Sequence, residues 1–176
     1  MLTRRGFLLS AGAAAAAALS ASPTEAALIG PHDRSIFLHN AHTGETLKTI
    51  YWSGGRYDPG ALQRLNVLLR DHYSDKIHHM DPRLIDLLSR LQSNFGGHRC
   101  FEVYSGYRSP ETNAMLASWS EGVAAHSLHM QGMAADIRLS GVGLRSLRYS
   151  AKRLRAGGVG SYHSFVHVDV GRVRYW

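Results

Sequence analysis

The sequence has 176 residues, 44% of them hydrophobic, which suits one globular domain with a sizeable core. Its single cysteine, Cys100, excludes an internal disulfide and a cysteine-rich zinc site. A formal net charge of +7 favours a polyanionic neighbour, and nucleic acid, anionic lipid and bacterial cell wall all meet that condition.

Residues 1–26 have the pattern of a removable export signal. Arg4 and Arg5 precede a short, alanine-rich apolar run, and residues 24–26 (TEA) form a small-x-small cleavage site. The run is too short and too weakly hydrophobic for a good membrane span. The segment TRRGFLL resembles a twin-arginine signal, and an ordinary secretion signal is the alternative.

The signal predicts that the mature chain, residues 27–176, is exported through the inner membrane into the periplasm, where it forms one domain. We therefore expect no nucleic-acid partner, despite the charge, and no stable membrane insertion after the signal is removed.

The first half of the mature chain predicts a hairpin and two helices. Two alternating runs, residues 35–40 and 45–52, flank a short glycine-containing turn and predict a β-hairpin. Helices are expected to begin at Pro59 and Pro82, because each proline follows an aspartate that can cap the first turn and leucines then recur at helical spacing.

The second half adds strands and two more helices. Residues 100–107 predict a strand that runs into a turn, and Ser109 caps a helix through about Trp119. A basic helix starts near residue 143 and is expected to end at Gly157-Gly158, and residues 164–171 predict a final strand. The order of elements predicts an α+β fold with an antiparallel sheet, helices packed on one face and a polar cleft on the other.

His129 and Asp136 raise the question of a shared site. Seven residues of helix span about 10.5 Å, and seven residues of strand about 23 Å with the side chains on opposite faces. Ligands of one zinc ion lie only about 2 Å from the metal. A turn must therefore bring the two together, and Gly132 permits it.

The last two strands share one pattern. In MAADIRL (133–139) the apolar residues alternate with Asp136, and in FVHVDV (165–170) the valines alternate with His167 and Asp169. Both strands thus bury an apolar face and present His or Asp on the other. Two histidines and one carboxylate, with room for water, form the ligand set of a catalytic zinc site.

Spaced motifs resemble a family of zinc peptidases. They are SGYRS (105–109), SLHMQGMAAD (127–136) and FVHVD (165–169), and they resemble the D-Ala-D-Ala carboxypeptidase/murein endopeptidase K type in the lysostaphin and hedgehog-like superfamily. The family signature S-x-H-x-x-G-x-A-x-D is matched at every defined position of the second motif. Further resemblance to the endopeptidase branch lies in HNAHTGE (39–45), RAGGVG (155–160) and GRVRYW (171–176).

The resemblance implies a zinc cleft with a role for each matched residue. His129, Asp136 and His167 would hold Zn²⁺. Arg108 would stabilise the oxyanion of the substrate carbonyl, which suits a guanidinium that is always charged and donates in a fork. Ser127 would bind the polar end of the substrate. Each has a simpler alternative: a buried histidine, a loop cap, a surface arginine or an ordinary turn serine.

The general base is the point at which the sequence departs from the carboxypeptidase pattern. Those enzymes carry Glu or Asp three residues before the last histidine ligand, and here that position is Ser164. Two replacements are available. His163 lies in the turn before His167. Asp169 shares the strand face of His167, about 6.6 Å further along, and its alternative role is to orient that histidine.

These observations predict a periplasmic zinc metallopeptidase that cleaves peptide cross-links in peptidoglycan, with its stem peptides as partners. Two alternatives remain open. One is a murein D,D- or L,D-carboxypeptidase, and the other is a non-catalytic, zinc-containing wall-binding module.

Overall fold

The computed structural model describes residues 33–120 and 122–176, so the predicted export signal lies outside the described residues. The strands are β1 (Arg34–Asn40), β2 (Thr46–Ser53), β3 (Arg56–Tyr57), β4 (Phe101–Ser105), β5 (Ala134–Leu139), β6 (Gly158–Ser161), β7 (Val166–Asp169) and β8 (Arg174–Tyr175). The helices are α1 (Pro59–Leu68), α2 (Pro82–Ser93), α3 (Pro110–Trp119), α4 (Leu144–Leu154) and the 3-10 helix η2 (Leu128–Gln131). None of these helices is long and apolar enough to cross a membrane.

All eight described strands form one sheet in the order β3-β2-β1-β4-β5-β7-β6-β8. The sheet is mostly antiparallel, which confirms the predicted α+β class. The predicted antiparallel sheet is confirmed for most of its pairings, but β1 pairs in parallel with β4 and β6 with β8. Between β1 and β4 the chain passes through α1 and α2, and such a long connection allows it to return in the same direction.

The helices begin where the capping pattern predicts. Asp58 accepts hydrogen bonds from the backbone N–H groups of Gly60 and Ala61, and Asp81 and Ser109 cap α2 and α3 in the same way. The predicted end of α4 is wrong: the helix ends at Leu154, and Arg155 takes the left-handed cap with φ of 50°. Gly157 and Gly158 lie beyond the helix end and pack against Asp169.

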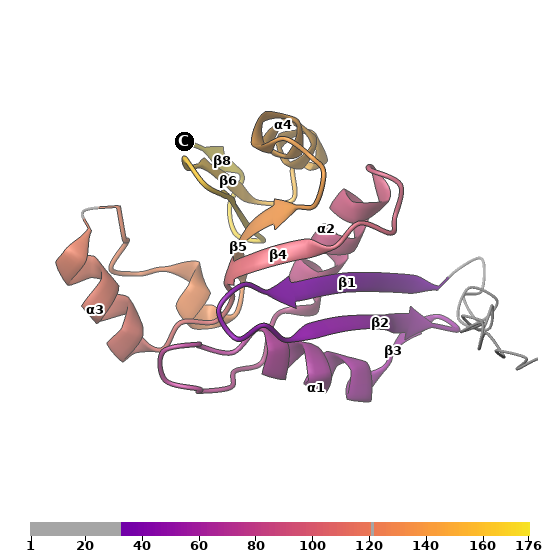
Figure 1. Ribbon diagram of the computed structural model, residues 1–176, viewed down its shortest axis with the longest axis horizontal. Coiled ribbons are helices and arrows are strands. Elements are labelled where there is room, and N and C mark those ends of the chain that lie inside the picture. Colours follow the sequence, from indigo (N-terminus) through magenta and orange to yellow (C-terminus); the bar gives the residue numbers. More distant parts are fainter. Residues whose placement is uncertain (1–32, 121) are drawn as a thin grey trace, which may run out of the picture.

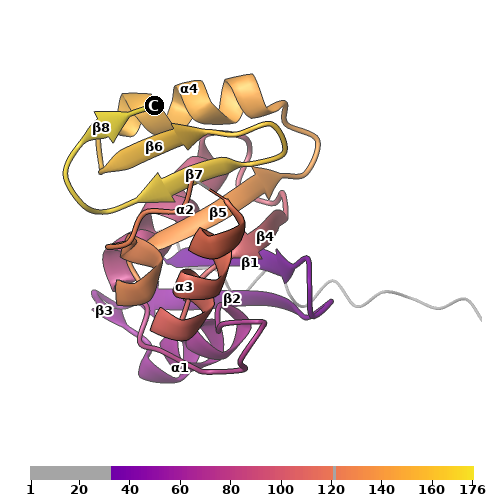
Figure 2. The same ribbon diagram turned by 90° about the vertical axis from the view of Figure 1, so that its left-hand side faces the viewer.

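One hydrophobic core lies between the sheet and three helices. Helices α1, α2 and α4 pack against the strands, whereas α3 stands beyond the ends of β1 and β4 (Figures 1 and 2). The predicted placement of the helices on one face thus holds for three of the four. Fully buried side chains of the core include Leu38, Leu65, Leu84, Phe101, Ile137, Leu147 and Val168.

The register of the sheet aligns polar residues across its other face. Ser105 of β4 lies opposite Asp136 of β5, which lies opposite His167 of β7, which lies opposite Gly160 of β6. Tyr104 is an extra residue at the β4–β5 pairing, and this bulge sets Ser105 in the row. Residues from four strands therefore meet on one face of the sheet.

Candidate metal centre and pocket

His129 reaches the row from η2, which precedes β5. The hydroxyl of Ser127 accepts a hydrogen bond from the backbone N–H of His129, 3.3 Å away, and caps this short helix. Nδ1 of His129 is 2.7 Å from the carbonyl oxygen of Gly106. That oxygen can only accept, so Nδ1 carries the proton and the lone pair of Nε2 faces the sheet.

Gly132 makes the turn between His129 and Asp136, as predicted from the spacing. Its φ of 67° is in the left-handed region, and its carbonyl accepts a hydrogen bond from the N–H of Asp81 at 2.9 Å. A side chain at this position would also overlap the backbone oxygen of His79. Glycine is therefore required both by the backbone conformation and by the close approach of the neighbouring loop.

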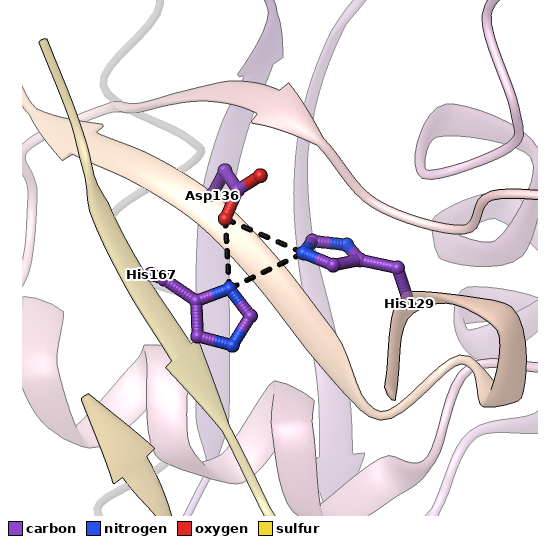
Figure 3. Close-up of side chains that lie close together, drawn as sticks. All are labelled: His129, Asp136 and His167. Atoms are coloured by element: carbon purple, nitrogen blue, oxygen red, sulfur yellow. Dashed lines mark hydrogen bonds and ion pairs between the residues drawn. The ribbon is translucent and has the colours of Figure 1, made fainter. Parts of the chain in front are cut away.

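His129, Asp136 and His167 converge on one point (Figure 3). Oδ1 of Asp136 is 2.9 Å from Nδ1 of His167 and 3.3 Å from Nε2 of His129. The two histidine nitrogens are 3.2 Å apart. All three residues are buried, with exposed fractions of 2%, 3% and 8%.

The three converging side-chain atoms have the chemistry of metal ligands. Three lone pairs that face one another repel unless a positive charge lies between them. Two ligands about 2.0 Å from a tetrahedral zinc ion are about 3.3 Å apart, which is close to the three separations here. Within the described residues this is also the only group of three or more His, Cys, Asp or Glu with such spacing.

Asp169 bonds the other ring nitrogen of His167. Its Oδ2 is 3.2 Å from Nε2, while Oδ1 accepts from the backbone N–H groups of Gly158 and Gly171, each at 2.9 Å. Burial raises the pKa of Asp169, but these hydrogen bonds and Arg174 outweigh it and hold the pKa well below its usual range. Asp169 is thus a buried anion that leaves Nδ1 of His167 free to face Asp136.

Burial and charge act in opposite directions on the three converging residues. Burial lowers the pKa of His129 and would raise that of Asp136, but the two histidines outweigh it and hold the Asp136 pKa far below its usual range. Burial would also lower the pKa of His167, but its bonds to Asp136 and Asp169 raise it. Of the two histidines, His167 is therefore the one that holds a proton more readily, and a metal ion at its Nδ1 competes with that proton.

Arg108 lies beside this cluster and faces the pocket. Its guanidinium donates to Oδ2 of Asp136, and its Nε donates to the hydroxyl of Ser105 at 2.7 Å. The following residue, Ser109, donates its N–H to the buried carboxylate of Asp71 at 2.9 Å, which anchors the loop. Arg108 thus contacts the acidic member of the cluster, a partnership the sequence analysis did not anticipate.

A pocket of about 470 Å³ opens above the cluster. Its lining includes residues of the 122–128 segment and the aromatic residues Tyr162, Phe165 and Trp176. Asp136 is the only carboxylate that the described residues contribute to its lining, whereas Arg108 and Arg174 each contribute a positive charge. The pocket therefore favours a ligand that carries negative charge.

The predicted site residues fall into two groups. His129, Asp136, His167, Arg108 and Ser127 all line the pocket, and Asp169 lies behind His167. His163 does not line the pocket, and its side chain is exposed.

Three contributors were missed: the Gly106 carbonyl, Arg174 and Trp176. The only signal that could have pointed to the last two was the GRVRYW segment, which resembles the family and was assigned no role.

Two histidines and one carboxylate that line an open pocket form a ligand set found in metal-dependent hydrolases. Residues 29–176 match the family model described as Peptidoglycan L,D-endopeptidase MepK. The chain belongs to this family of metallopeptidases.

Relatives of the same description cover most of the chain. Peptidoglycan L,D-endopeptidase MepK of Escherichia coli (strain K12) is 41% identical over 175 residues, which span 98% of this chain and 96% of that protein. Probable peptidoglycan L,D-endopeptidase MepK of Haemophilus influenzae is 41% identical over 149 residues, 83% of this chain and 80% of that protein.

Proposed function

We propose that this protein is a zinc-dependent endopeptidase that cleaves peptide cross-links in peptidoglycan. The observation that carries the proposal is the convergence of Nε2 of His129, Oδ1 of Asp136 and Nδ1 of His167 at the floor of a pocket. Membership of the MepK family supports the same conclusion.

Zinc, when bound, supplies a Lewis acid that polarises a carbonyl and lowers the pKa of water toward about 7. His129, Asp136 and His167 would hold it. Arg108 would orient the scissile carbonyl from the pocket wall and stabilise the negative charge that develops on its oxygen. Ser127, which also lines the pocket, would bind a polar group of the stem peptide.

The relatives and the pocket support the choice of substrate. Both relatives are named for L,D-endopeptidase activity on peptidoglycan, so the bonds proposed here are the cross-links that join two diaminopimelate residues. Such cross-links carry free carboxylates, which suits a pocket with Arg108 and Arg174 in its lining. The proposed location is the periplasm, reached through the export signal at residues 1–26, with the twin-arginine route as its proposed pathway.

Digestion of purified sacculi tests the proposal. Zinc-loaded protein, chelator-treated protein and zinc-treated His129→Ala protein are each incubated with sacculi, and the fragments are identified by mass spectrometry. We expect only the zinc-loaded protein to convert cross-linked dimers into monomers. Release of single terminal amino acids would instead identify a carboxypeptidase, and binding without any fragment would identify a wall-binding module.

A further inference from the structure

The carboxy-terminal strand β8 lies at the edge of the sheet and borders the pocket. It pairs with β6, and its side chains alternate between the two faces. Arg174 and Trp176 line the pocket, while the hydroxyl of Tyr175 donates to the carbonyl of Lys152 on the α4 side at 3.1 Å. The alternation brings two side chains of the GRVRYW segment to the site.

Arg174 makes a bidentate contact with Asp169, in which both terminal nitrogens of its guanidinium bond the carboxylate. One terminal nitrogen is 2.8 Å from Oδ2 of Asp169, and the other is 3.2 Å from Oδ1. The second nitrogen also donates to the carbonyl oxygen of Arg172 at 3.0 Å, which orients the guanidinium. A two-point contact of this kind fixes the direction of the carboxylate as well as its charge.

The backbone around Asp169 is packed too closely for side chains. A side chain at Gly157 would overlap the carbonyl of Asp169, and one at Gly158 would overlap its carboxylate. This accounts for the glycine pair after α4, in the segment RAGGVG. Asp169 is 0% exposed, so its charge depends entirely on the partners that the protein provides.

We propose that Arg174 is a positioning residue of the metal centre that acts through Asp169. Arg174 and His167 both bind Oδ2 of Asp169, so the contacts run in a line from Arg174 through Asp169 to Nε2 of His167. The line ends at Nδ1, which faces Asp136 and His129. Arg174 thereby maintains the ring orientation in which Nδ1 can bind a metal. The inference rests on the proposed function only in taking zinc as the metal.

Arg174 also supports the wall of the pocket. Its guanidinium lies 4.9 Å from the centre of the Trp176 ring, which in turn is 5.3 Å from the centre of the His167 ring. The indole N–H of Trp176 donates to the hydroxyl of Tyr162 at 3.2 Å. A Cβ atom at residue 160 would lie only 2.7 Å from the indole, so glycine at this position provides the space that the Trp176 ring needs. Loss of Arg174 should therefore loosen the wall as well as the ligand.

Zinc affinity tests the inference without reference to peptidase activity. The dissociation constant is measured by competition with a chromophoric chelator for the wild type, Arg174→Ala, Arg174→Lys and the control Arg172→Ala. Arg172 is exposed and lies two residues away, and its hydrogen bond with Arg174 is made by its backbone carbonyl, which alanine retains. Because two backbone N–H groups still hold Asp169, we expect Arg174→Ala to weaken zinc binding by about tenfold, the low end for such partners. Lysine should restore part of the affinity, and Arg172→Ala should bind as the wild type does.

A double-mutant cycle separates positioning from a general structural role. If Arg174 acts through Asp169, adding Arg174→Ala to Asp169→Asn should change the zinc affinity by less than about twofold. Additive losses, or wild-type affinity in Arg174→Ala, would overturn the inference. Circular dichroism and thermal unfolding establish that each variant is folded, and Arg174→Lys provides the comparison if the alanine variant is not. Absence of sacculus digestion by the wild type would reject the proposed function and leave this result intact.

Discussion

Asp136 lies directly opposite His167 on the neighbouring strands β5 and β7, and Oδ1 of the first is 2.9 Å from Nδ1 of the second. Directly opposite residues of an antiparallel pair share a face, with Cβ atoms about 5 Å apart. Register alone therefore brings two of the three ligand atoms together. A shift of β7 by one residue against β5 would turn His167 toward the apolar core and leave Asp136 without its partner.

Removal of either histidine should remove the metal. His129→Ala and His167→Ala each leave two ligands, too few for a stable structural or catalytic zinc site, so zinc content and peptidase activity should be lost together. The fold should survive, because the core is formed by apolar side chains and not by the metal. Elemental analysis measures the zinc, and His98→Ala, at an exposed position, is the control. Near-stoichiometric zinc in His167→Ala would refute the ligand assignment.

Zinc affinity should depend on pH in one direction. The contacts of His167 with Asp136 and Asp169 raise its pKa, so a proton competes more strongly with zinc for Nδ1 than it would for an ordinary histidine. Affinity should therefore rise by up to about tenfold per pH unit below that pKa and level off above it. The same proton stabilises the metal-free fold below the ordinary histidine pKa of about 6.5, and this contribution is lost as the pH rises through the raised value. Competition titrations from about pH 5.5 to 8 would detect the rise, and a flat profile would contradict it.

Arg108→Ala should lose rate much more than metal. Loss of a charged donor to a developing oxyanion typically lowers kcat by about 10² to 10³. Zinc binding should weaken by at most about tenfold, because the substitution removes one partner of Asp136 and none of the three ligand atoms. The comparison is made at saturating zinc, with Arg56→Ala at an exposed position as the control. Unchanged turnover would make Arg108 a structural partner of Asp136 only.

Gly132→Ala should destabilise the protein and displace His129. The left-handed backbone conformation costs alanine about 1 kcal/mol, and overlap with His79 adds a further cost. Gly44 offers a matched control, since its φ of 74° is similar and a side chain there would meet nothing. Urea unfolding should therefore show a larger loss for Gly132→Ala than for Gly44→Ala, together with weaker zinc binding. Equal losses of unfolding free energy in the two variants would mean that the loop containing His79 moves to accommodate the added methyl group.

Local signals predicted the parts of the site that depend on neighbours in sequence. The Asp-Pro and Ser-Pro pairs marked the starts of α1, α2 and α3, and Gly132 marked the turn after His129. Contacts between distant segments were not predictable in this way. Strand β8 has two residues, too few to show alternation, so nothing in the sequence placed Arg174 beside Asp169.

The same limit applies to the carbonyl of Gly106 and to Arg108. The contacts of a backbone oxygen cannot be predicted from the sequence, yet this oxygen determines that Nε2 of His129 faces Asp136 and His167. The bulge at Tyr104 brings Ser105 into line with Asp136, and Arg108 bonds both. An irregular register of this kind cannot be read from a period-two pattern.

Substitution of Asp169 separates its two predicted roles, as the base that accepts a proton from water and as the partner that orients His167. Asp169 bonds Nε2 of His167, on the side of the ring away from Asp136 and His129. Asp169→Asn should therefore weaken zinc binding by roughly 10- to 100-fold and leave much of the turnover once zinc is saturating. Zinc retention with complete loss of hydrolysis would instead identify Asp169 as the base.

His163 and His126 differ in placement, and paired substitutions decide between them. His163 is exposed and outside the pocket lining, whereas His126 lines the pocket next to Ser127. A base must come within about 2.6 to 3.2 Å of the proton it takes, although contacts can be longer before substrate binds. We expect His126→Ala to retain zinc and lose about 10²-fold or more in kcat, and His163→Ala to remain close to the wild type. The reverse result would require the turn that carries His163 to close over the pocket when substrate binds. Full activity in both variants would exclude both histidines as the base.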